Sequence, residues 1–218
     1  MQRRASTIAF WTVTTPYRPA YYDPLGTENV TSAICRELER QPLIPLTPPI
    51  GRFDGAGLYA IYYRGSDFDL YAPLTGHKIP VYVGQARSHN SATGAATGAR
   101  NPLWRRMQQH SASIDGADNL ALSDFGARLL LLPDVHADLG ENGLRVFYRP
   151  VWNAILTGFG SHEQGPTTRQ SRRSAWDTVH PGRNRTFGVS DNDPIGLRAE
   201  VQEHVRDQLS SYETVPWR

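Results

Sequence analysis

Residues 57–63 read GLYAIYY, and residues 80–86 read PVYVGQA. Both stretches are rich in the β-branched and aromatic residues that suit half-buried strands. Glycines and small polar residues break the interval between them, as expected for a turn or loop. The pattern predicts two neighbouring strands, with Tyr59 and Tyr82 near their middles. These two strands define the predicted fold. They do not by themselves define a function, because a buried strand tyrosine is usually a packing residue.

The rest of the chain supplies helices and a further strand around this pair. Apolar residues at helical spacing mark several segments, and prolines at 102, 150 and 194 mark where helices begin or end. Glu141 is expected in the first turn of its helix, where an anion suits the helix dipole. The predicted elements are helices over residues 28–39, 102–110, 139–149 and 194–209, and a third buried strand over residues 128–133.

Composition limits the class of protein. The 218 residues are 39% hydrophobic and 20% charged, which is enough apolar material for a real core. No apolar run reaches the length of a membrane span, and residues 1–11 lack the apolar region of a signal peptide. The single cysteine, Cys35, cannot form an internal disulfide. These features together predict a cytoplasmic protein.

Charge is unevenly distributed although the net charge is only +2. Residues 159–187 hold five arginines against two acids, whereas residues 188–218 hold six acids against three arginines. Arginine suits bidentate contacts with phosphate and with guanine edges. A solvated basic loop that grips only phosphate is the equally weighted alternative for this segment.

Six polar residues stand out on the predicted elements. Two are the strand tyrosines, two lie four residues apart on one helical face, one begins a helix, and one follows a Pro-x-x-Asn turn. Each has an ordinary alternative: a packed tyrosine, a solvated helix face, a residue that offsets the helix dipole, or a turn residue. The set consists of Tyr59, Tyr82, Arg106, His110, Glu141 and Asn153.

In this order, the six residues resemble the GIY-YIG nuclease superfamily. "GLY" at 57–59 and "YVG" at 82–84 stand for the two motif triads, with Leu58 and Val83 replacing isoleucine. His110, one helical turn after Arg106, makes the chain similar to the type II restriction endonucleases of this superfamily, in particular the branch that cuts CCGCGG. Segments 158–162, 174–177 and 180–183 also resemble that branch. The resemblance covers about residues 55–187.

The resemblance implies an α/β (α+β) fold of the GIY-YIG type. Its core is a small central three-stranded antiparallel sheet flanked by helices, with an N-terminal arm and DNA-binding insertions. We expect a single nuclease domain over residues 1–218. Its parts are an N-terminal arm and helix over 1–54, a catalytic core over 55–158, and a basic DNA-contacting segment with a C-terminal helix over 159–218.

The resemblance also implies roles for the six residues. Glu141 would hold one Mg²⁺, and Arg106 would present its fork to the nonbridging phosphate oxygens. A coupled pair of Tyr59 and His110 would take the proton of the attacking water, and the sequence does not separate their two roles. Tyr82 is expected to hydrogen-bond phosphate or water, and Asn153 to orient its neighbours.

DNA binding is expected from the loop after the second strand and from the basic segment. The implied partner is double-stranded DNA bound by a homodimer, with a DNA methyltransferase as the functional counterpart in a restriction–modification system. A repair or homing nuclease, or a DNA-binding protein on a degenerate nuclease scaffold, are the competing readings. The predicted DNA contacts are Gln85, Arg87, His89, His162, Arg169, Arg172, Arg173, Arg183 and Arg185.

Overall fold

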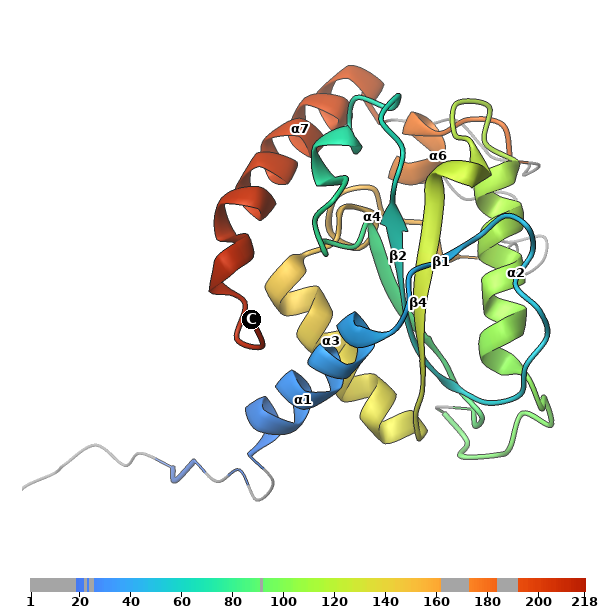
Figure 1. The fold of residues 1–218 in the computed structure, drawn as a ribbon, viewed down its shortest axis with the longest axis vertical. Helices are drawn as coiled ribbons and strands as arrows, with labels where there is room; N and C mark the ends of the chain where they lie inside the picture. The colour runs from blue at the N-terminus through green and yellow to red at the C-terminus, as the bar shows by residue number, and fades with distance from the viewer. Residues whose placement is uncertain (1–18, 22, 24–25, 91, 162–172, 184–191) are drawn as a thin grey trace, which may run out of the picture.

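Strand β2 (Gly57–Tyr63) lies inside the sheet, and all seven of its residues are buried. It pairs antiparallel with β3 (Tyr82–Ala86) on one side and with β4 (Phe125–Leu131) on the other. The computed structural model describes residues 19–21, 23, 26–90, 92–161, 173–183 and 192–218 (Figure 1). The three strands predicted from the sequence are therefore confirmed, with β2 between the other two, although the third spans Phe125–Leu131 and not residues 128–133.

A fourth strand extends the predicted three-stranded sheet. The two-residue β1 (Ile44–Pro45) pairs with β4, so the strand order is β1-β4-β2-β3. Segment 41–52 contains four prolines, and a strand this short leaves no alternation to recognise in the sequence. The mixed α/β fold is as predicted, with one more strand, and β3 forms an open edge of the sheet.

Helices cover both faces of the sheet, with α2 (Pro102–Asp115) on one side and α1 (Thr27–Arg40) and α3 (Asp134–Tyr148) on the other (Figure 1). Successive strand residues point to opposite faces. The Tyr59 side chain therefore turns to α2, and its neighbour Leu58 turns to α3. The sheet separates the tyrosine from the helix that carries Glu141.

Helix α3 begins earlier than the sequence indicated, and this corrects the place of Glu141. The helix starts at Asp134, so Glu141 lies two turns inside it and is not in its first turn. Gly140 lies inside the helix and serves close packing there. A Cβ at Gly140 would lie 2.6 Å from Cδ2 of Leu58 and 2.7 Å from Cγ2 of Ile34. Compensation of the helix dipole therefore does not account for Glu141.

The C-terminal helix α7 (Pro194–Ser211) agrees with the prediction. Asp193 caps its first turn by accepting hydrogen bonds from the backbone of Ile195 and Gly196, and Pro194 occupies the first helical position. The end of the chain is fixed against the core, because Nε1 of Trp217 donates to Oε1 of Glu39 at 2.7 Å. The remaining elements are η1 (Ala72–Leu74), η2 (Leu122–Asp124), α4 (Val151–Ala154), α6 (Ala175–Val179) and η3 (Tyr212–Thr214).

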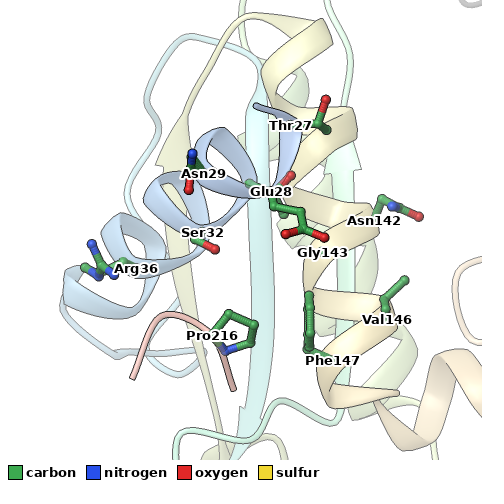
Figure 2. A pocket seen from close by; sticks show the side chains of 11 residues that line it. Thr27, Glu28, Asn29, Ser32, Arg36, Asn142, Gly143, Val146, Phe147 and Pro216 are labelled. Carbon is green, nitrogen blue, oxygen red and sulfur yellow. The ribbon is translucent and has the colours of Figure 1, made fainter. Parts of the chain in front are cut away.

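None of the helices in the described part of the chain combines the length and apolarity needed to cross a membrane. A hollow of about 830 Å³ lies between α1 and α3 (Figure 2). None of the six residues expected to be catalytic lines it, so this hollow is separate from the candidate site. Its lining includes Glu28, Arg36, Asn142, Val146, Phe147 and Pro216.

Candidate active site

Tyr59 and His110 form a buried pair between β2 and α2. The Tyr59 hydroxyl lies 2.6 Å from Nε2 of His110, and neither side chain is exposed to solvent. Burial above all, and then the neighbouring Tyr82, raises the pKa of Tyr59 well above its ordinary value, although Arg106 opposes the shift. The phenol therefore stays protonated, and its hydroxyl can donate to Nε2 when that nitrogen carries no hydrogen. The structure brings together the two residues expected to share proton transfer.

Arg106 lies one turn before His110 on the same face of α2, as the spacing predicted. Its Nε donates to the Tyr59 oxygen at 3.4 Å, and its Nη2 donates to the Gly160 carbonyl at 2.9 Å. The guanidinium is thus fixed beside the phenol oxygen. A permanent positive charge at this point favours any negative charge that develops on that oxygen.

Tyr82 and Phe159 complete this side of the sheet. The Tyr82 ring lies edge-on to both His110 and Phe159, with ring centroids 5.3 Å and 4.9 Å away. Phe159 stacks on the His110 ring at 4.7 Å and 17°. The sequence analysis placed Phe159 at the start of a basic segment and missed this contact. The available signals were the aromatic residue between Gly158 and Gly160 and the resemblance of segment 158–162 to the restriction-enzyme branch.

Two glycines make room for the tyrosine hydroxyls. A Cβ at Gly84, in the second motif triad, would lie 2.4 Å from the Tyr59 hydroxyl oxygen. A Cβ at Gly160 would lie 2.2 Å from the Tyr82 hydroxyl oxygen. Real Cβ atoms do not approach other atoms this closely, so both positions need glycine for space. Gly84, the last residue of the YVG triad, therefore leaves the space that the Tyr59 hydroxyl occupies.

Glu141 approaches from the other face of the sheet, beside the edge strand β3. Its Oε2 accepts a hydrogen bond from Nε2 of Gln85 at 2.7 Å, and its Oε1 lies 3.9 Å from Nη1 of Arg145. Burial raises the pKa of Tyr82, Arg106 lowers it, and the Glu141 carboxylate raises it further. Glu141 is thus close enough to the tyrosines to affect their pKa, although it lies on the opposite face of the sheet.

The surroundings of Glu141 fit a magnesium ion. Its side chain is partly exposed at 20%, and the Asp138 carboxylate lies beside it, because both accept from Nε2 of Gln85. Within the described residues no group of three or more His, Cys, Asp or Glu could enclose a metal. Mg²⁺ is commonly held by one or two carboxylates together with waters and substrate phosphate, and the Glu141 carboxylate fits a site of that kind.

Asn153 is turned to the backbone of β3. Its Oδ1 accepts from the Val83 N–H at 2.9 Å, and its Nδ2 donates to the Val83 carbonyl at 3.0 Å. The amide thus satisfies both outward-facing groups of Val83 on the open edge of the sheet. Asn153 therefore binds the strand that carries Tyr82, and its orienting role in the site stays a prediction.

Three residues expected to contact DNA lie at the end of β3 and just after it, and each is held by an acid of α3. Gln85 donates to Asp138 and Glu141, and Arg87 forms an ion pair with Asp138. His89 lies 3.3 Å from the Asp134 carboxylate, which also accepts from the backbone of Ser88 and His89. The sequence analysis assigned no role to these two aspartates, because only the fold brings them to the loop. The acids of α3 therefore organise this part of the loop.

Arg183 does not fit its expected role in contacting DNA. It is buried, and its Nη2 donates to Oδ2 of Asp177 at 2.8 Å and to the Gly158 carbonyl at 3.0 Å. Its Nη1 donates to the Phe159 carbonyl at 3.0 Å. Arg183 therefore holds the Phe159 segment in place and is removed from the expected DNA contacts. Arg173 is exposed. The expected contacts His162, Arg169, Arg172 and Arg185 lie outside the described residues.

Comparison of the chain with known protein families identifies its family. A family model described as the Eco29kI GIY-YIG domain matches residues 51–211. The chain belongs to this family. It is a GIY-YIG family of type II restriction endonucleases, so the chain carries a nuclease domain whose substrate is DNA. The match includes all six residues of the candidate site. No curated protein sequence matches the chain significantly.

Proposed function

We propose that the protein is a Mg²⁺-dependent type II restriction endonuclease that hydrolyses double-stranded DNA at a specific site. The observation that carries this proposal is the buried contact between Tyr59 and His110, with Arg106 beside the phenol oxygen. Phosphodiester hydrolysis needs a group that accepts the proton of the attacking water and a cation beside the phosphoryl oxygens. These three side chains supply both from one face of the sheet.

The proton transfer follows from the geometry of the pair. The raised pKa of Tyr59 keeps its phenol neutral, so it cannot accept a proton unless it gives up its own. Nε2 of His110, 2.6 Å away, is the acceptor for that proton. Tyr59 then takes the proton of the attacking water while Arg106 favours the transient phenolate. In this scheme Tyr59 contacts the water, and His110 is the final acceptor.

Glu141 is the residue proposed to hold the metal ion. Mg²⁺ bound there supplies charge neutralisation and stabilises the leaving 3′ oxygen. Arg106 orients the phosphate, Tyr82 hydrogen-bonds phosphate or water, and Asn153 keeps β3 in register. The proposed site thus has residues on both faces of the sheet, next to the edge strand β3.

We further propose that two copies act on one palindrome. One core has one metal-binding glutamate and one arginine clamp, so it cuts one strand, and a two-fold dimer matches the symmetry of palindromic DNA. The concentration of arginine in residues 159–187 favours guanine-rich sites, and CCGCGG is the specific proposal. A DNA methyltransferase that protects the same site would be the functional partner.

Digestion of a plasmid of known sequence, with and without Mg²⁺, tests this function. Discrete fragments that require Mg²⁺ and end within a GC-rich palindrome are the expected result. A smear would indicate a nuclease without site specificity, and fragments from asymmetric sites would favour a homing enzyme. No cutting under any condition would favour the non-catalytic scaffold. Sedimentation of one subunit per cut duplex would contradict the two-fold dimer.

A further inference from the structure

Gln85 is bound by two carboxylates at once. Its Nε2 donates to Oδ1 of Asp138 and to Oε2 of Glu141, which are one helical turn apart on α3. A primary amide has two N–H donors, and here both are directed at acids. Oε1 of the same amide is buried and has no hydrogen-bond partner among the residues that the structure describes. The orientation of this side chain is therefore set by the two carboxylates.

Asp138 is the centre of this arrangement. On its other side, Nη2 of Arg87 donates to the same oxygen that binds Gln85. Asp138 thus connects the first basic residue after β3 to the amide that touches the proposed metal-binding carboxylate. The Arg87 and Asp138 side chains are 35% and 43% exposed, and exposed ion pairs contribute only about 0–1 kcal/mol to stability. The ion pair between Arg87 and Asp138 therefore adds little to the stability of the fold.

We propose that Asp138 and Gln85 are positioning residues for Glu141. Asp138 fixes the amide so that an N–H, and not the carbonyl oxygen, faces Glu141. The amide then holds Oε2 of Glu141 and determines the direction of the carboxylate. Metal-binding carboxylates depend on such outer hydrogen bonds, and loss of one typically lowers metal affinity about 10–100-fold. This inference rests on the proposed function, because it requires Glu141 to hold the metal.

The inference is tested by removing the support while leaving Glu141 in place. Asp138→Ala releases the amide, and Gln85→Met keeps the length of the side chain but removes its N–H donors. Two quantities are measured: binding of Mn²⁺ to the protein, from the loss of the free-ion EPR signal, and the Mg²⁺ concentration at half-maximal single-turnover cleavage of saturating DNA. We expect both to weaken about 10–100-fold, and Asp138→Ala should recover most of the maximal rate at high Mg²⁺. Thermal stability should change little.

Two further variants separate positioning from general damage to the loop. Asp138→Asn keeps an oxygen that accepts from Gln85, so it should restore much of the metal affinity lost in Asp138→Ala. Asp134→Asn disturbs the neighbouring contacts to Ser88 and His89 but not Gln85, so metal affinity should stay at the wild-type value.

The outcomes also separate this inference from the proposed function. The positioning role is overturned if Asp138→Ala keeps the wild-type metal affinity and the wild-type Mg²⁺ concentration at half-maximal cleavage. It is also overturned if Asp134→Asn loses as much metal affinity as Asp138→Ala. In both cases Mg²⁺-dependent cleavage by the wild type still stands. Cleavage by the wild type without any divalent cation, or wild-type metal affinity in Glu141→Ala, would overturn both.

Discussion

The Tyr59 hydroxyl lies 2.6 Å from Nε2 of His110, and both residues are fully buried. If this contact carries the proton transfer, Tyr59→Phe should slow single-turnover cleavage by about 10²–10⁴-fold, the usual contribution of general base catalysis. The change also leaves Nε2 buried without this partner, which costs about 1–3 kcal/mol of unfolding free energy. Cleavage rate and denaturant unfolding, measured on the same sample, check both effects.

The fold contains a matched control for this variant. The Tyr71 hydroxyl lies 2.6 Å from Nε2 of His180 in a second buried pair. Tyr71→Phe should cost similar stability but leave the cleavage rate within a few-fold of the wild type. Equal rate losses in the two variants would show that the Tyr59 effect comes from packing and not from chemistry.

The space at Gly160 gives a second prediction. In Gly160→Ala the new methyl group collides with the Tyr82 hydroxyl, whose ring is held between His110 and Phe159. We expect a loss of about 1–3 kcal/mol in stability and, because displacement of catalytic groups by about 1 Å costs about 10²-fold, a cleavage rate at least that much lower. Gly51→Ala is the control, since a Cβ there meets nothing within 4 Å. Wild-type kinetics for Gly160→Ala would contradict the close packing.

Loss of Arg183 should lower stability, whereas loss of Arg173 should weaken DNA binding. Arg183→Ala leaves Asp177 as a buried charge without its main partner, so we expect a loss of about 3–5 kcal/mol in unfolding free energy. Arg173→Ala, at an exposed position, should keep stability and weaken binding to specific DNA more than to nonspecific DNA. Denaturant titration and DNA-binding assays on both proteins decide the matter. A stable Arg183→Ala protein with altered DNA specificity would restore the original expectation.

His180 predicts how stability depends on pH. Burial, with the charges of Arg198 and Arg183, lowers the pKa of His180 to about 3. Below pH ~6.5 the unfolded chain binds a proton that the folded chain does not, so stability is lost as pH falls from ~6.5 toward 3. The contribution approaches about 1.4 kcal/mol per pH unit. Denaturant unfolding between pH 4.5 and 7.5 should show a steeper decline for the wild type than for His180→Gln. Parallel declines would contradict this assignment.

Sequence reasoning succeeded where the signal is local. The residue types of 57–63 predict β2 to its end residues, and the four-residue spacing of Arg106 and His110 places both on one face of α2. It failed at the start of α3, which was predicted at residue 139 and lies at Asp134. Gly140 therefore lies inside the helix, where it allows the close approach of Leu58 and Ile34.

The remaining differences concern partners that are distant in the sequence. Arg183 was expected to contact DNA because basic residues are concentrated around it, but burial against Asp177 depends on how the segment folds. Asp138 received no role, because its contact with Gln85 joins residues 53 positions apart. The approach of Phe159 to His110 is likewise a product of the fold. Residue type and spacing reveal the chemistry of a site more readily than its supports.

Glu141→Ala is the most direct test of a metal-dependent catalytic site. Plasmid cleavage over a range of Mg²⁺ concentrations and binding to the same DNA are measured for the variant, the wild type, and Glu37→Ala, which removes an exposed carboxylate on α1. We predict that Glu141→Ala binds DNA within a few-fold of the wild type and cleaves none of it at any Mg²⁺ concentration, while Glu37→Ala behaves as the wild type. Cleavage by Glu141→Ala at close to the wild-type rate would contradict the account.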